Sequence, residues 1–273
     1  MRSWKVTVRI SFVAVAGLAL LIGGRNSSRA QQSGDVREFL EERYLGQLTT
    51  MDETQYFLEA RILSVPRIDE AQRWLQYAED TRNQILDRVV FRGEAARWRN
   101  LPTNVQWLDT IAGGPGYRIK KLRYEAVPGM WVPALLYEPE RLEGRVPVVL
   151  NVNGHDGNGK AAAYKQLRCI NYAKRGMLAL NVEWFNMGQL RQPGFAHYKL
   201  NQLDLLGTSG MAPFYLNMSR GMDILLTHPN ADPHRTMVTG LSGGGWQTIF
   251  YSALDPRVKL ANPVAGYSSF KTR

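Results

Sequence analysis

Residues 236–254 have the sequence TMVTGLSGGGWQTIFYSAL, and this stretch decides which fold we expect for the chain. The β-branched and apolar run at 236–241 is typical of a buried strand, and residues 245–254 are typical of a helix. Between them, Ser242 has the spacing G-x-S-x-G, which puts a nucleophilic serine on a sharp turn from strand to helix. The flanking glycines let strand and helix approach closely, and the helix N-terminus favours negative charge nearby. The sequence therefore predicts that Ser242 is a nucleophile.

Compact apolar runs recur along the chain and alternate with helical patterns. The predicted elements are a hairpin of 117–125 with 131–137, buried strands at 147–153, 177–183, 236–241 and 259–264, and helices at 164–173 and 214–225. This alternation predicts an α/β fold with a mostly parallel sheet and helices on both faces. Sites in such sheets form at the carboxyl ends of the strands, so functional residues are expected directly after these runs.

The first 30 residues have the organisation of a secretory signal peptide. Basic residues precede an apolar segment at 10–22, and Ser28-Arg29-Ala30 offers the small residues that a signal peptidase requires. The apolar segment would cover about 20 Å of helix, less than the ~30 Å hydrocarbon core of a bilayer. We therefore expect residues 1–30 to be removed and the product to be secreted or periplasmic, without a stable membrane anchor.

Residues 31–98 are predicted to form a helical N-terminal segment, and residues 99–273 the α/β domain. Val36, Leu40 and Tyr44 indicate a first short helix. A longer helix is indicated across 68–90 by an apolar stripe of Ala71, Leu75, Ala78, Ile85 and Val89. An apolar stripe with charges on the other face favours core packing, so this segment is expected to pack on the main domain as a cap or lead-in.

The composition excludes several classes of protein. A chain of 273 residues with 44% hydrophobic and 21% charged residues is no disordered polar chain, collagen or coiled coil. The net charge falls from +10 to +5 without residues 1–30, which carry five basic and no acidic residues, and no basic run remains to predict a nucleic-acid partner. Cys169, the single cysteine, is predicted to be a core residue of a helix. No Cys, His and Asp cluster has metal-ligand spacing, so no metal or other cofactor is predicted.

A glycine-rich loop, NGHDGNGK at 153–160, follows the strand at 147–153. Its backbone N–H groups can stabilise a carbonyl oxygen that becomes an oxyanion, with the N–H of Gly243 as the other donor. Asp156 and Gly157 are the candidate donors in the loop, and the sequence does not separate them. His155 is expected to orient the loop by hydrogen bonding. A phosphate-binding loop is not predicted, because alanine rather than serine or threonine follows the lysine of the loop.

Two further segments are expected near the mouth of the site. The segment EWFNMG at 183–188 follows the next strand, and its aromatic residues, Trp184 first among them, form either an acyl or sugar platform or ordinary buried packing. His197 lies in the loop beyond this segment, where it either contacts substrate or makes a local hydrogen bond.

Five segments together resemble secreted bacterial α/β-hydrolases of the acetyl xylan esterase kind, which are related to dienelactone hydrolase-like and prolyl-oligopeptidase-like hydrolases. The segments are GHDGNGK at 154–160, AKRG at 173–176, ADPHR at 231–235, GLSGGGWQT at 240–248 and ALDPRVK at 253–259. The resemblance covers about 103–267 and implies an eight-stranded, mostly parallel sheet with a triad in the order Ser, Asp or Glu, His. It also implies hydrolysis of carboxylic esters, with removal of acetyl groups from polysaccharides as the expected reaction. A serine peptidase of prolyl-oligopeptidase type remains the alternative, because it shares the elbow.

The triad that this resemblance implies is incomplete in the sequence. The acid and the histidine of this fold follow the nucleophile, whereas all four histidines, at 155, 197, 228 and 234, precede Ser242. Asp255 follows the nucleophile helix in an Asp-Pro turn and is expected to be structural. We therefore expect two C-terminal strands to be missing and an exposed apolar edge around Val264. Either the sequence stops short of a longer enzyme, or the product is a catalytically inactive fragment that acts at most as a binding module.

Overall fold

The computed structural model describes residues 33–267, and the chain divides into two units, residues 1–57 and 58–273. The helices α1 (Ser33–Glu41) and α2 (Thr49–Glu59) begin in the first unit. Helix α1 confirms the short helix predicted from Val36 and Leu40, whereas α2 was not predicted. The predicted signal peptide at 1–30 lies outside the described residues. Within 33–267, no helix combines the length and the apolar character that crossing a membrane requires.

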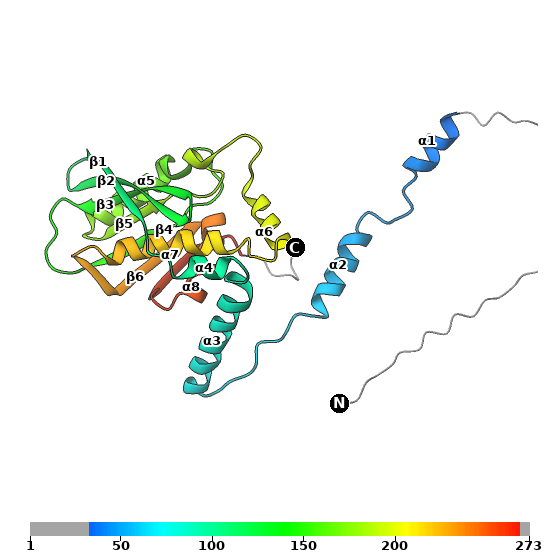
Figure 1. The fold of residues 1–273 in the computed structure, drawn as a ribbon, viewed down its shortest axis with the longest axis horizontal. Coiled ribbons are helices and arrows are strands. Elements are labelled where there is room, and N and C mark those ends of the chain that lie inside the picture. The colour runs from blue at the N-terminus through cyan, green and yellow to red at the C-terminus, as the bar shows by residue number, and fades with distance from the viewer. Residues whose placement is uncertain (1–32, 268–273) are drawn as a thin grey trace, which may run out of the picture. The chain divides into compact units, whose positions relative to one another are not determined.

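The second unit is built around a mixed sheet of seven strands in the order β1-β2-β3-β5-β4-β6-β7 (Figure 1). The strands are β1 (Val105–Ala112), β2 (Tyr117–Val127), β3 (Met130–Pro139), β4 (Val146–Asn151), β5 (Leu178–Val182), β6 (Ala231–Leu241) and β7 (Leu260–Val264). Strands β5, β4, β6 and β7 are parallel to one another, while β1, β2 and β3 extend the sheet in antiparallel pairs. The predicted hairpin and all four predicted runs are therefore confirmed as strands, but β7 is exposed along its length and not buried as predicted, because it lies at an edge of the described sheet. The sheet of the described residues has seven strands, and one of these, β1, was not among the predicted elements.

The two edges of the sheet are more exposed than its centre. Strand β1, which the sequence pattern did not predict, is exposed along almost its whole length, so it lacks the alternation of buried and exposed residues that marks a strand. At the other edge every residue of β7 is exposed, with Leu260 at 59% and Val264 at 42%. The apolar edge expected around Val264 is thus present.

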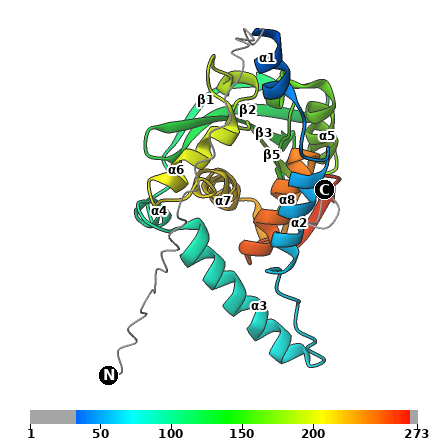
Figure 2. The same cartoon turned by 90° about the vertical axis from the view of Figure 1, so that its right-hand side faces the viewer.

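Helices cover both faces of the sheet, as predicted (Figures 1 and 2). Helix α5 (Ala163–Lys174) packs on β2, β3 and β5, and α7 (Ala212–Leu226) and α8 (Gly243–Leu254) pack on the opposite face. Cys169 is fully buried on the sheet side of α5, which confirms its prediction as a core residue. The remaining short helices are η2 (Gly159–Ala161), η3 (Gly188–Leu190), η4 (His197–Asn201) and α6 (Gln202–Leu205), which lie in loops that follow β4 and β5.

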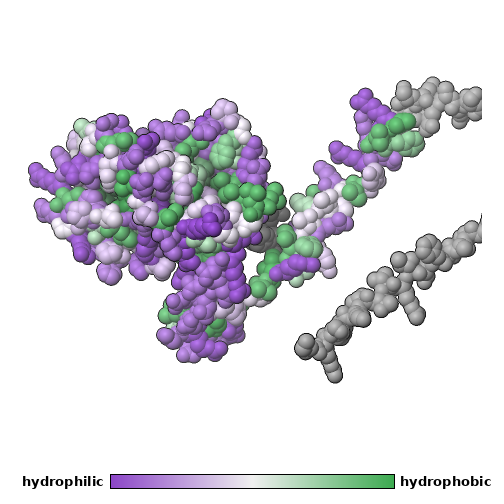
Figure 3. All heavy atoms as spheres, in the orientation of Figure 1, coloured by the Kyte–Doolittle hydropathy of each residue, from purple (hydrophilic) through white to green (hydrophobic). Residues whose placement is uncertain are grey.

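The helix predicted across 68–90 is present, but the side chains that it buries differ from the predicted stripe. Helix α3 (Ala71–Ile85) continues as a π-helical turn η1 (Leu86–Val90), followed by α4 (Ala95–Arg99). Leu75 and Val89 of the predicted stripe are exposed, and α3 has a largely hydrophilic surface (Figure 3). The wider π turn shifts the helical register, so that Leu86, Val90 and Phe91 enter the core instead.

Candidate active site

Ser242 lies at the junction of β6 and α8 in a backbone conformation that few residues adopt. Its φ is 57° and its ψ is −115°, and it is the residue directly before the first turn of α8. A Cβ at Gly240 would lie 2.5 Å from the carbonyl oxygens of Gly244 and Val152, and a Cβ at Gly244 would lie 2.6 Å from that of Val152. Any side chain at either glycine would collide with backbone, so the two glycines permit the strained turn that exposes Ser242.

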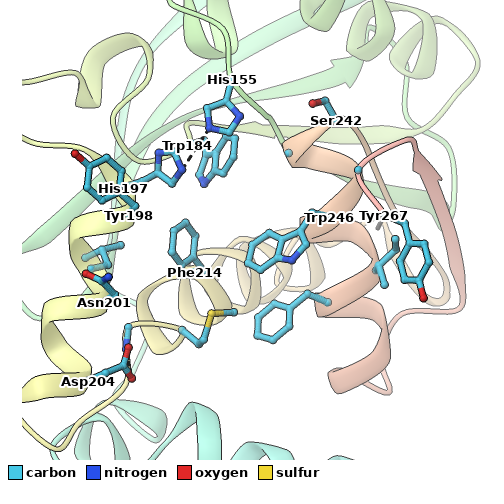
Figure 4. A pocket seen from close by; sticks show the side chains of 17 residues that line it. His155, Trp184, His197, Tyr198, Asn201, Asp204, Phe214, Ser242, Trp246 and Tyr267 are labelled. Carbon is cyan, nitrogen blue, oxygen red and sulfur yellow. Dashed lines mark hydrogen bonds between the residues drawn. The ribbon is translucent and has the colours of Figure 1, made fainter. Parts of the chain in front are cut away.

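Ser242 opens into a cleft of about 890 Å³ (Figure 4). The lining residues come from the loops after β4 and β5 and from α7, α8 and the segment after β7. Those that carry the argument below are His155, Trp184, His197, Phe214, Ser242, Gly243 and Trp246. In residues 33–267, no other group forms a hydrogen bond with the Ser242 hydroxyl, which leaves it accessible to a ligand in the cleft.

The loop after β4 meets the elbow at Gly154. A Cβ at Gly154 would lie 2.8 Å from the nitrogen of Gly243, so only glycine allows this approach. The next residue, His155, lines the cleft. Asp156 and Gly157, which the sequence offered as oxyanion donors, are not among the residues that line the cleft, and the Asp156 carboxylate accepts the N–H of residue 158 at 2.9 Å. The oxyanion role of these two residues stays a prediction.

His155, His197 and Trp184 form a cluster on the wall of the cleft. The Nε2 atoms of the two histidines are 3.3 Å apart, and the Trp184 ring lies 4.5 Å from the His155 ring and 5.0 Å from the His197 ring (Figure 4). Burial and the neighbouring His155 lower the pKa of His197. The hydrogen bond between His155 and His197 joins two loops, since the residues are 42 apart in sequence.

Trp184 combines the two alternatives that the sequence left open. Its side chain is 3% exposed and packs against Phe214, yet it also lines the cleft. A Cβ at Gly243 would lie 2.3 Å from the Trp184 ring, so the ring covers the start of α8. Trp184 Nε1 and His197 Nδ1 are buried without a hydrogen-bond partner among the described residues.

Helices α7 and α8 add an aromatic wall that the sequence analysis did not identify. The Trp246 and Phe250 rings stack with centroids 5.4 Å apart and planes 5° apart, and Phe214 meets Trp246 edge-on at 5.8 Å. Figure 4 shows Trp246 and Phe214 facing the same cleft as Ser242. Their helical spacing alone indicates amphipathic packing, and only the adjacency of the two helices reveals a cleft wall.

A buried ion pair, also not predicted, holds the two loops of the site together. The Glu183 carboxylate, 1% exposed, accepts the Lys160 backbone N–H at 2.6 Å, the Lys160 ammonium at 2.9 Å and the Gln189 backbone N–H at 3.3 Å. Gly159 and Gly188, both with positive φ, leave room for the carboxylate, since a Cβ at either would lie within 2.5 Å of its oxygens. The only sequence signal for this ion pair, called the Glu183–Lys160 clamp below, was an acidic residue at the end of a buried strand.

Asp255 has the structural role that the sequence predicted. It is 3% exposed, accepts the Tyr251 hydroxyl at 2.6 Å and pairs with Arg257 at 2.7 Å. Burial would raise the pKa of Asp255, but the hydrogen bonds from Arg257 and Tyr251 hold it below its ordinary value. Across residues 33–267 no three His, Cys, Asp or Glu side chains are grouped so as to hold a metal ion.

Comparison with known proteins gives one family and a common fold. The family described as acetyl xylan esterase (AXE1) matches residues 94–272. A solved structure described as an acetyl xylan esterase from Bacteroides fragilis superposes with a TM-score of 0.63 at 16% identity, over 79% of this chain and 59% of that one. The methylesterase BT1017 gives 0.58 at 20% identity, over 79% and 46%, and acetyl xylan esterase 1 from Thermoanaerobacterium sp. gives 0.53 at 19%, over 67% and 56%.

These comparisons show that the second unit has the α/β-hydrolase fold. The chain spans about half of the length of the three solved structures, between 46% and 59%. No match was found among curated proteins.

Proposed function

The chain belongs to the acetyl xylan esterase family, and we propose that it acts as a serine esterase that forms an acyl-enzyme on Ser242. The observation that carries this proposal is the strained Ser242, exposed in the cleft beside the N-terminus of α8. Strain of this kind persists where the surrounding structure holds a functional group in place. It supports a nucleophile more than a tight structural turn, because a structural turn needs no accessible hydroxyl.

The proposed reaction is a double displacement. Ser242 Oγ attacks the ester carbonyl carbon, the carbonyl π electrons move to the oxygen, and collapse of the tetrahedral intermediate expels the alcohol and leaves an acyl-serine. Water then attacks the acyl-serine and releases the carboxylic acid. The serine proton passes to a general base, which in this fold is a histidine that follows the nucleophile together with the triad acid. Residues 243–273 contain no histidine, so the proposal requires a base from outside the given sequence. His155 and His197 precede Ser242 and are proposed to shape the cleft and touch substrate rather than to act as this base.

Two backbone N–H groups are proposed to stabilise the oxyanion. Gly243 N–H is at the free N-terminus of α8 and makes no hydrogen bond among the described residues. For the second donor the geometry supports His155 N–H over those of Asp156 and Gly157, because Gly154 touches Gly243 and His155 lines the cleft. Loss of one such donor typically lowers the rate by ~10²–10³.

The proposed substrate is an ester on a polysaccharide. The cleft of about 890 Å³ is far larger than an acetyl group and has an aromatic wall of Phe214, Trp246 and Phe250. Sites that bind ligands of this size are lined by aromatic side chains with a few polar groups, and here these include Ser242 and His155. Export through the predicted signal peptide would bring the protein to such a substrate outside the cell.

The test is turnover and labelling of a full-length form that carries the triad acid and histidine implied by the resemblance, and of its Ser242→Ala variant. We expect the wild type to hydrolyse 4-nitrophenyl acetate and to release acetate from acetylated xylan, and a fluorophosphonate probe to label Ser242. Ser242→Ala should abolish all three, whereas Ser252→Ala, a serine on the same helix α8, should retain them. Undiminished turnover by Ser242→Ala would contradict the proposal. Cleavage of a blocked prolyl peptide without release of acetate would identify a peptidase, and no labelling would indicate an inactive fragment.

A further inference from the structure

Lys165 on α5 is a buried cation that forms no ion pair within residues 33–267. The residue is 1% exposed, and its ammonium makes one hydrogen bond among the described residues, to the carbonyl oxygen of Gly154 at 3.4 Å. The carboxylates of Asp156 and Glu183 act on it only at longer range, and Arg168 opposes them. Burial is the main reason why the pKa of Lys165 is lowered. The Lys165 ammonium also lies 5.6 Å from the centroid of the Tyr164 ring, a cation–π contact. One weak hydrogen bond and one ring contact offset little of the cost of burying a charge, so stabilisation of the fold does not account for Lys165.

The position of the ammonium fixes the direction of one peptide group. The described residues contain no cis peptide bond, so the N–H of His155 points opposite to the Gly154 carbonyl, which faces Lys165. Lys165 is on α5, and Gly154 lies against Gly243 at the start of α8. The N–H of His155 therefore points away from α5, and it has no acceptor among the described residues.

We infer that Lys165 is a positioning residue, which holds the Gly154–His155 peptide so that the His155 N–H is presented as an oxyanion donor beside Gly243. This inference rests on the proposed function of Ser242. The hydrogen bond from a cation polarises the peptide and strengthens its N–H as a donor. The buried positive charge also favours the negative charge that develops on the oxyanion, since its field is weakly screened inside the protein.

The experiment measures binding of phenylboronic acid to the full chain, because its boron forms a tetrahedral anion on a reactive serine without turnover. We expect saturable binding that Ser242→Ala abolishes. Lys165→Met should raise the dissociation constant by about tenfold or more, less than the ~10²–10³ effect of losing a donor outright. Its Tm should be unchanged or higher, since apolar replacement of a buried charge is often neutral or stabilising. Lys174→Met removes an exposed lysine from the same helix and should leave both values unchanged.

The outcomes separate this inference from the proposed function. If the wild type forms no boronate adduct on Ser242, the proposed function fails and the inference fails with it. If the wild type binds and Lys165→Met binds equally well, the proposed function stands and the inference is overturned. Weaker binding together with a lower Tm, or a variant that does not fold, would assign Lys165 to packing and would also overturn it. Weaker binding with an unchanged or higher Tm supports it.

Discussion

Replacement of Glu183 by glutamine tests whether one buried carboxylate holds the two loops of the site. Glutamine keeps one acceptor oxygen, but its NH₂ group would face donors that now point at the second carboxylate oxygen. Those donors are the Lys160 ammonium and the Gln189 backbone N–H. The substitution would also leave the ammonium of Lys160, a residue that is 6% exposed, without its counter-charge.

The expected effect is large because both partners are buried. Removing one partner of a buried ion pair typically destabilises by about 3–5 kcal/mol, since the remaining charge is left uncompensated. For a folded unit of this size, such a loss lowers the Tm by about 6–20 °C. The same loss is a large part of the ~5–15 kcal/mol that stabilises a typical domain.

The assay is urea unfolding of wild type and Glu183→Gln, followed by tryptophan fluorescence, because Trp184 adjoins Glu183 and is buried. Glu143→Gln, an exposed glutamate, is the matched control and should change the unfolding free energy by less than about 0.5 kcal/mol. The double variant Lys160→Met with Glu183→Gln removes the stranded ammonium and should recover part of the loss. A change of less than about 1 kcal/mol in Glu183→Gln would refute the reasoning, since it would mean that the pair is solvated and clamps nothing.

Two further predictions concern acid stability and the elbow. Burial would raise the pKa of Glu138, but hydrogen bonds from a histidine, a lysine and an arginine lower it from 4.5 to about 2. Glu138 therefore stabilises the fold above pH 4.5, and this contribution is lost as the pH falls toward 2. Between pH 4.5 and pH 2 the unfolding free energy of the wild type, measured by urea unfolding, should fall by about 2–3 kcal/mol more than that of Glu138→Gln. An equal fall in the two proteins would contradict the lowered pKa of Glu138. Gly154→Ala should lower ester hydrolysis by about tenfold or more, because its Cβ would lie 2.8 Å from the Gly243 nitrogen and displace the oxyanion loop. Gly114→Ala, whose Cβ would make an ordinary 3.4 Å contact, is the control, and equal activity of the two variants would show that the loop does not serve the site.

The sequence determined the elements whose signals are local. Apolar runs bounded by turn residues located the central strands, because strands buried on both faces need continuous apolar side chains. The strained turn at Ser242 was equally visible, since it depends on glycines two positions before and after Ser242 in the chain. The sequence pattern did not predict the edge strand β1, because an edge strand need not have an apolar face. Almost all residues of β1 are exposed.

Tertiary structure alone decided which residues line the cleft and which contacts hold its loops. The Glu183–Lys160 clamp joins residues 23 apart, Lys165 meets Gly154 across the loop after β4, and no periodicity marks either pairing. The register of the π turn likewise decided which side chains of the N-terminal helices enter the core, although the sequence had placed a helix there. A sequence pattern reports how often apolar and glycine residues recur along the chain, whereas hydrogen bonds and ion pairs between loops depend on which strand ends the sheet order brings together. That order, β5-β4-β6, sets the loops with His155 and Trp184 beside the elbow of Ser242.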